Sequence, residues 1–421
     1  MCRWSRSLLL VVVVAAVAAC TASRHDTQPN IGEVRVGLLA PFSGPDAPAG
    51  ADALHGAELA AALLNGESSS VRLSDLGLHG FDRGTVKIVP ADAASSPERA
   101  HATDKPDRAV NAAVRLVDQE GVVGLIGAYD ADVTADTSQR TERVGIPFLN
   151  GDSSAGYLTE RGLDWFFRIG PTDRLLGEAA FSVLRQQAAA GIATRRIGIL
   201  YANDAASNSA VAAVQALANE GGYDVLPKGG VIFEPGSDPT APVQRIRGQR
   251  PDAVFLIASS SADAQKLVKA FAKPGYRPPA IFTLGPGFLQ SATVKAVGAA
   301  GDGLLYSTGW SPESASRNPS AKVIVSLYQQ QFHAPMSEVA AGTFSAVLTF
   351  ATAVDNAGSV DPQRVRAALL SLDVPGRGTI MPWDGIRFDA THQNARATGV
   401  VEQRTGGSFR MVFPPELGPA T

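Results

Sequence analysis

Few residues in this chain have the types and spacing that acid–base or covalent chemistry requires. Histidine is the usual general base near neutral pH, and the chain contains six. Only His55 opens an expected helix; the others fall in polar stretches: His25, His79, His101, His333 and His392. The motifs G-x-S-x-G, H-E-x-x-H and G-x-x-x-x-G-K-[ST] are missing, and no G-x-G-x-x-G lies between a strand and a helix. We therefore expect a protein that is not an enzyme and that uses no cofactor.

The two cysteines, Cys2 and Cys20, indicate export. Two arginines precede an apolar run over 8–19, which is shorter than the roughly 20 residues that a membrane-spanning helix needs. The run is therefore typical of a signal peptide. It ends in VAAC, which resembles the lipobox of bacterial lipoproteins. That resemblance implies removal of residues 1–19, a lipid on Cys20 and a lipid-anchored location on the extracytoplasmic face of the cell membrane, since two or more acyl chains suffice for anchoring.

Composition limits the possible metal sites, binding partners and number of domains. With Cys2 removed and Cys20 lipidated, the folded part has no thiol, so disulfides and cysteine-based metal sites are excluded, and we expect no metal. The 37 basic and 40 acidic residues leave a net charge of -3, which provides no basic surface for nucleic acid. A chain of 421 residues that is 45% hydrophobic is long enough for two domains. We expect a small-molecule partner, and nothing in the sequence indicates an oligomer rather than a monomer.

Apolar strands alternate with helices along most of the chain. A polar tether over 20–32 precedes a strand at 34–40, a turn-rich loop at 41–50 and a helix at 51–64. The unit recurs with strands at 85–89, 122–127 and 147–150, helices at 109–120 and 133–144 and a short helix near Tyr157. A second series has strands at 196–201, 231–233, 253–258 and 280–284 with helices at 172–189, 205–220, 262–273 and 290–297. This alternation predicts two α/β units with parallel sheets that helices cover on both faces.

The last part of the chain is different. We expect helices at 320–331, 340–357 and 362–371, followed by short antiparallel strands near Ile386, Val400 and Met411. The segments 66–84 and 97–108 are polar, turn-rich and aperiodic, which favours surface insertions over a third domain.

Several stretches resemble type I periplasmic solute-binding proteins, in particular the leucine-isoleucine-valine-binding branch. They are VRVGLLAPFSGP, GAELAAALLN, GLIGAYDADVTADTSQRTERVGIPFLNGDSSAGYLTERG, FFRIGPTDRLLGE and GSVDPQRVRAAL, and the resemblance extends over 33–413. It implies two Rossmann-like lobes joined by three hinge crossings. The amino-terminal lobe would hold 33–169 with 308–377, and the carboxy-terminal lobe 170–307 with 378–413, leaving a tail at 414–421. The implied function is capture of an amino acid, amide or related amine for an ABC permease.

Such a fold suits solute binding because strand ends and helix amino termini from both lobes face one cleft. Unpaired N–H groups there attract carboxylates and hydroxyls. Hinge closure removes water from the ligand, which in turn stabilises the closed state.

The resemblance places ligand contacts in the first lobe at Asp152 and Ser154, with Ser153 between them. The family contacts its ligand there through a backbone carbonyl and a hydroxyl. A serine at this point can equally cap the next helix, and the two roles are compatible. In the preceding loop the family's carboxylate-binding serine is replaced by Ala131, while Thr134 either supplies a hydroxyl one position later or caps its helix.

The second lobe departs further from the family. Its aromatic contacts are replaced by Ala206 and Ser259, and its acidic ammonium ligand falls on Gly287, which disfavours a branched-chain amino acid. Four aspartates can place negative charge around the cleft, which would suit a cationic or amine-bearing ligand: Asp130, Asp132, Asp152 and Asp204. An aspartate at a helix start, such as Asp204, can instead cap the helix. Three aromatic residues can form stacking walls or simply pack: Phe42, Tyr129 and Tyr157.

Two other classes of function stay open. A sensory or structural lipoprotein can keep the same binding fold without transport, and a neighbouring permease or sensor-kinase gene would distinguish these cases. An exported hydrolase is the third class, and it lacks a supporting motif.

Overall fold

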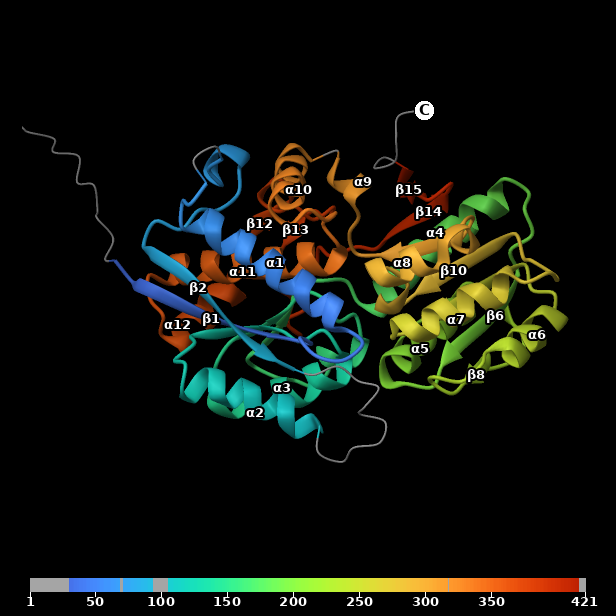
Figure 1. Ribbon diagram of the computed structural model, residues 1–421, viewed down its shortest axis with the longest axis horizontal. Helices are drawn as coiled ribbons and strands as arrows, with labels where there is room; N and C mark the ends of the chain where they lie inside the picture. Colours follow the sequence, from blue (N-terminus) through green and yellow to red (C-terminus); the bar gives the residue numbers. More distant parts are fainter. Residues whose placement is uncertain (1–29, 69–70, 94–104, 317, 416–421) are drawn as a thin grey trace, which may run out of the picture.

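The computed structural model describes residues 30–68, 71–93, 105–316 and 318–415, with the side chains of 105–107 left out. The expected signal peptide, Cys20, most of the tether, part of the insertion at 97–108 and most of the tail lie outside these residues. Two α/β bodies lie side by side along the long axis of the molecule (Figure 1). Within the described ranges, none of the helices combines the length and apolar character needed to cross a membrane.

The first body is built on a parallel sheet in the order β2-β1-β3-β4-β5. The strands are β1 (Gly32–Ala40), β2 (Gly84–Asp92), β3 (Gly124–Gly127), β4 (Phe148–Asn150) and β5 (Phe166–Arg168). One core lies under α1 (Ala47–Leu64), α10 (Pro319–Phe332), α11 (Glu338–Ala357) and α12 (Pro362–Leu370), and another under α2 (Lys105–Asp118) and α3 (Ala131–Val144). Burial on both faces explains the near-continuous apolar strands.

The second body has a mixed sheet in the order β15-β14-β11-β10-β9-β6, with β7 and β8 both pairing β6. Its parallel part comprises β6 (Arg196–Ala202), β7 (Asp224–Val225), β8 (Val231–Phe233), β9 (Ala253–Ile257), β10 (Ala280–Leu284) and β11 (Leu305–Thr308). The strands β14 (Val400–Thr405) and β15 (Ser408–Phe413) add an antiparallel edge. Helices α4 (Asp173–Ala189) and α5 (Ala205–Glu220) cover one face, and α6 (Thr240–Gly248), α7 (Ser261–Ala272) and α8 (Ser291–Val297) the other.

The prediction of two α/β lobes with parallel sheets is confirmed. The chain leaves the first lobe after β5, returns to it through α9 (Pro312–Ala315) and leaves it again before β14. The last crossing comes later than the expected boundary at 377–378, because Ile380, Trp383 and Ala397 belong to the core of the first lobe. The short pair β12 (Val374–Pro375) and β13 (Gly385–Ile386) also precedes the crossing.

The segment 66–84 is not wholly the surface insertion that we expected. It holds a short 3-10 turn, η1 (Ser74–Leu76), and buries Leu73, Leu78 and Phe81 in the core of the first lobe. Its apolar residues follow neither a helical nor a strand period, which is why periodicity does not reveal their burial. Short elements such as β5, β7, β11 and α6 also lay outside the predicted strands and helices.

Candidate functional site

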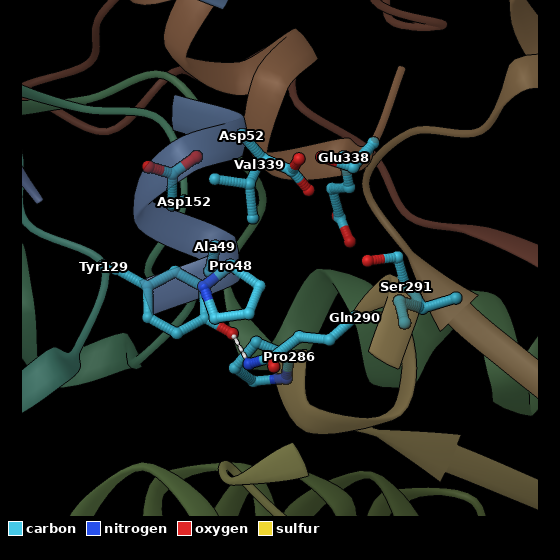
Figure 2. Close-up of a pocket in the computed structure, with 12 residues that line it drawn as sticks. Pro48, Ala49, Asp52, Tyr129, Asp152, Pro286, Gln290, Ser291, Glu338 and Val339 are labelled. Atoms are coloured by element: carbon cyan, nitrogen blue, oxygen red, sulfur yellow. Dashed lines mark hydrogen bonds between the residues drawn. The ribbon is translucent and has the colours of Figure 1, made fainter. Parts of the chain in front are cut away.

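A pocket with about 470 Å³ of empty space, its open mouth included, lies between the lobes. The first lobe contributes residues from α1, from the loops after β3 and β4 and from the start of α11: Pro48, Ala49, Asp52, Tyr129, Asp152, Ser337, Glu338 and Val339. The second lobe contributes the stretch between β10 and α8: Pro286, Leu289, Gln290 and Ser291. Figure 2 shows Glu338 extending toward Ser291, with Asp52 and Asp152 above Gln290 in this view. Ends of strands and starts of helices therefore form the walls, as the fold requires.

The two loops of the first lobe are tied together by the buried side chain of Asn150 at the end of β4. Its Nδ2 atom donates to the carbonyls of Gly127 and Ala128, both at 2.9 Å. Its Oδ1 atom accepts from the N–H of Ser153 at 3.0 Å. One amide thus fixes the loop that carries Tyr129 relative to the loop that carries Asp152.

Glycines let the Asp152 loop lie directly against α11. A Cβ atom on Gly342 would lie 2.9 Å from Asp152 Oδ1 and 2.9 Å from the carbonyl oxygen of Gly151. A Cβ atom on Gly151 would lie 2.6 Å from the carbonyl oxygen of Gly342. These distances are too short for any side chain, so both glycines are needed to bring Asp152 to the start of α11.

Three carboxylates line the pocket, and none of the described lysine, arginine and histidine residues does. Burial raises the pKa of Asp152 to about 8, and the nearby Glu338 adds to the rise. Burial also raises the pKa of Glu338, although hydrogen bonds from Thr308 and the Gly309 N–H oppose the rise. Burial raises the pKa of Asp52 in the same way, against a hydrogen bond from Ser337. Each carboxylate would be stabilised in its charged form by a cation.

Gln290 joins the two lobes. Its Nε2 atom donates to the hydroxyl of Tyr129 at 2.8 Å, drawn as a dashed line in Figure 2, and to Asp46 Oδ1 at 3.0 Å. All three residues are buried. Burial, with the negative charge of Asp46 nearby, raises the pKa of Tyr129 well above its usual value, so the hydroxyl stays protonated. Gln290 Oε1 and Asp152 Oδ1 are buried and have no hydrogen-bond partner among the described residues.

Of the predicted site residues in the first lobe, Tyr129 and Asp152 line the pocket. The hydroxyl of Thr134 donates to the carbonyls of Ala128 and Asp130, and that of Ser154 to Asp173 Oδ1 at 2.6 Å. Three more residues do not line the pocket: Phe42, which packs against the first core, and Ala131 and Ser153, which are both buried.

The predicted residues of the second lobe serve local structure. Asp204 caps α5, accepting from the Ser207 N–H at 2.8 Å. Ser259 hydrogen-bonds to Asp204, and Ala206 packs against a core of the first lobe. The pocket residues that sequence reasoning missed are Asp52, Gln290 and Glu338. Glu338 had one signal, since Ser337 before it is a helix cap just ahead of the predicted helix.

Sequence comparison identifies the family. A profile of the periplasmic binding proteins matches residues 33–408. The chain belongs to this family. Leu/Ile/Val-binding protein homolog 7 of Brucella abortus (strain 2308) is 24% identical to the chain over 415 residues, 96% of each protein. Homolog 8 of the same strain is 25% identical over 391 residues, 91% of each.

Solved structures confirm the type I periplasmic binding protein fold. A leucine-binding protein, LivK, of Thermotoga maritima matches with a TM-score of 0.72 at 21% identity, covering 90% of this chain and 97% of its own. LivJ of Streptococcus pneumoniae, in complex with isoleucine, matches with a TM-score of 0.69 at 20% identity and covers 92% of this chain and 100% of its own. A solute-binding protein of an R. palustris ABC transporter, in complex with benzoate, matches with a TM-score of 0.70 at 20% identity. It covers 90% of this chain and 96% of its own. The predicted resemblance is confirmed, and these relatives are solute-binding proteins rather than enzymes.

Proposed function

We propose that this periplasmic binding protein captures a small polar solute, an amino acid, amide or related amine, and delivers it to an ABC permease. The pocket between the lobes carries the proposal, because both lobes supply polar side chains to one space, as small-molecule sites between domains do. The related proteins with leucine, isoleucine and benzoate in their names support an organic solute. The protein works as a monomer, without a cofactor and without catalysis.

Closure of the two lobes around the solute provides the mechanism. The contacts of Gln290 with Tyr129 and Asp46 form only when the lobes are together. A ligand that touches both lobes stabilises this closed state by its difference in affinity between the closed and open forms. The closed form is then the signal that the permease recognises.

A ligand panel tests the binding function. A compound at a hundred times its dissociation constant stabilises a protein by about 2.7 kcal/mol, which thermal denaturation detects. We expect at least one amino acid, amide or amine to raise the melting temperature. If every compound of these classes and the sugars leaves it unchanged, solute capture is wrong.

The proposed lipid on Cys20 holds the protein on the extracytoplasmic face of the cell membrane, since more than one acyl chain gives stable anchoring. We expect Cys20→Ala to move the protein from the membrane fraction to the soluble fraction. Membrane retention of this variant would contradict lipid attachment at Cys20.

A further inference from the structure

We infer that the solute is an organic cation, with ammonium or guanidinium groups that Asp52, Asp152 and Glu338 bind. This inference rests on the proposed function, because it names the class of solute that the pocket takes. The three carboxylates come from three separate segments, α1, the loop after β4 and the start of α11. The pocket is therefore acidic because of its tertiary structure rather than through one acidic stretch of sequence.

The charge of the lining is one-sided. Of the twelve lining residues three carry carboxylates, and no cationic side chain is among them. The negative charge of Glu338 disfavours the charged form of Asp152, and a cation bound beside Asp152 would relieve this repulsion. Among the described residues, no group of acidic or histidine side chains has the arrangement of a metal site, which favours an organic cation.

The unpartnered atoms of the pocket are hydrogen-bond acceptors. Gln290 is only 7% exposed, and its amide nitrogen is already used by Tyr129 and Asp46. Its Oε1 atom and Asp152 Oδ1 are left without a partner among the described residues. A buried acceptor without a donor is unfavourable, so a ligand rich in N–H groups gains where a ligand rich in oxygen atoms does not.

The nearby helix starts offer little to an anionic ligand. α1 begins at Ala47 and has Pro48 in its first turn, which has no N–H, and the N–H groups of Ala49 and Gly50 already donate to the carbonyl of Asp46. At the start of α11 the Ala340 N–H donates to the hydroxyl of Ser337, and Glu338 adds a negative charge. These contacts reduce the attraction for a carboxylate that a free helix start would have.

The walls between the polar groups are apolar. Pro48, Leu289 and Val339 lie among the lining residues, and Pro286 lies beside them. Such walls suit a short chain of methylene groups between or beside the charged groups. Diamines, agmatine and arginine combine these features.

Calorimetry on the full chain in detergent tests the inference, with putrescine, agmatine and arginine as cationic probes and leucine, glutamine and glutamate as the others. We expect a cationic probe to bind, and Asp152→Asn and Glu338→Gln each to weaken it by about 30-fold or more, as loss of one partner of a buried charge pair does. Asp118→Asn removes the same charge from an exposed position on α2 and should leave binding unchanged. At pH 7 cation binding should also release protons in the wild-type protein, a measurement that needs no variant.

The outcomes separate the two proposals. Binding of leucine, glutamine or glutamate that both pocket variants leave unchanged would overturn the cation assignment and leave solute capture intact. Cation binding that neither variant weakens and that releases no protons would overturn the assignment too. If no probe of either group binds, the cation assignment is wrong, and the wider ligand panel decides solute capture.

Discussion

Two sets of polar side chains lie where the lobes meet, and they differ in whether their hydrogen-bonding atoms already have partners in the protein. In the first set, Thr134, Asn150 and Ser154 all donate to protein atoms. In the second set, Asp152 and Gln290 keep buried acceptor atoms without a partner among the described residues. The first set holds the loops in place, whereas the second supplies the acceptor atoms that the proposed cation would use. Polar groups that lie within a few residues of each other in the sequence can therefore have opposite roles.

The difference also appears in charge. Ser154 donates its hydroxyl to Asp173 Oδ1 at 2.6 Å, and this bond opposes the rise that burial causes in the pKa of Asp173. Among the described residues, the carboxylate of Asp152 has only a long contact to Thr343, at 3.5 Å, and the repulsion of the nearby Glu338. An uncompensated carboxylate reduces the stability of the protein without solute, and it strengthens the binding of a cation.

Gly342→Val should have the largest effect on the second set. The added side chain would meet Asp152 Oδ1 and the Gly151 carbonyl, each 2.9 Å from the Cβ position. We expect a loss of about 2–3 kcal/mol in the free energy of unfolding, the upper part of the usual range for overpacking, together with loss of solute binding. Denaturant unfolding measures the first and calorimetry the second. Gly248→Val is the matched control, because no atom lies within 4 Å of its Cβ position; equal losses in both variants would contradict the steric argument.

Ser154→Ala and Asp152→Asn should separate the two sets by their effects on the protein without solute. Removing the hydroxyl of Ser154 leaves Asp173, which is 5% exposed, without that donor, and we expect a loss of about 1–3 kcal/mol in the free energy of unfolding. Asp152→Asn removes a repelled carboxylate, so stability should stay the same or rise. Chemical denaturation without solute provides both values. A large loss in Asp152→Asn with no loss in Ser154→Ala would reverse the comparison.

Stability without solute should fall as pH rises from about 5 to 8.5. Burial raises the pKa of Asp152 to about 8 and that of Glu402 to about 7, so the folded protein keeps protons that the unfolded chain has lost. The groups facing Asp152 include Glu338 and Thr343, and those facing Glu402 include Ser311, Glu313 and Glu338. Stability from these protons is complete below the unfolded pKa near 4 and is lost as pH passes the folded values.

The slope is at most about 1.4 kcal/mol per pH unit for each whole proton, and partial exposure of Asp152 reduces it. Thermal unfolding across this pH range measures the slope. Asp152→Asn should flatten its upper part and Glu402→Gln its lower part. A melting temperature that rises from pH 5 to 8.5 would contradict this account.

Tyr129→Phe should have the smallest effect. It removes the 2.8 Å hydrogen bond from Gln290 across the lobes but leaves the contact of Gln290 with Asp46. We expect about 0.5–1.5 kcal/mol less stabilisation of the closed state, or about 2- to 10-fold weaker solute binding. Tyr223→Phe is a suitable control for loss of a tyrosine hydroxyl, because this partly buried tyrosine packs against a core of the second lobe. Equal affinities in wild type and Tyr129→Phe would remove Gln290 and Tyr129 from the closing contact.

Sequence reasoning worked best on long regular elements. Helix 205–220 and strand 280–284 coincide with α5 and β10, because their apolar patterns and flanking turn residues are local signals. The short edge strand β7 and the crossing strand β5 carry only two or three residues each, too few for a period to show. The late third crossing depends on Trp383 and Ile386 packing in the first lobe, which no local pattern specifies.

The site was predicted in part. Tyr129 and Asp152 follow the ends of adjacent strands, so motif and topology together place them at the pocket. Asp52 and Glu338 lie in or before helices that the sequence also predicts, but nothing local shows that their side chains meet Asp152. Gln290 comes from the other lobe and reaches Tyr129 and Asp46 only when the lobes are together.

The sequence by itself determined the two α/β units, their parallel sheets and the family, since alternation of strand and helix and short motifs are properties of neighbouring residues. Only the tertiary structure decided which acids share a pocket and which hydroxyls are already used. The hydrogen bond between Gln290 and Asp46, which lie 244 residues apart, depends on packing. Glycines at the contact between Gly151 and Gly342 set how closely those groups approach, and that approach determines their charge and their free hydrogen bonds.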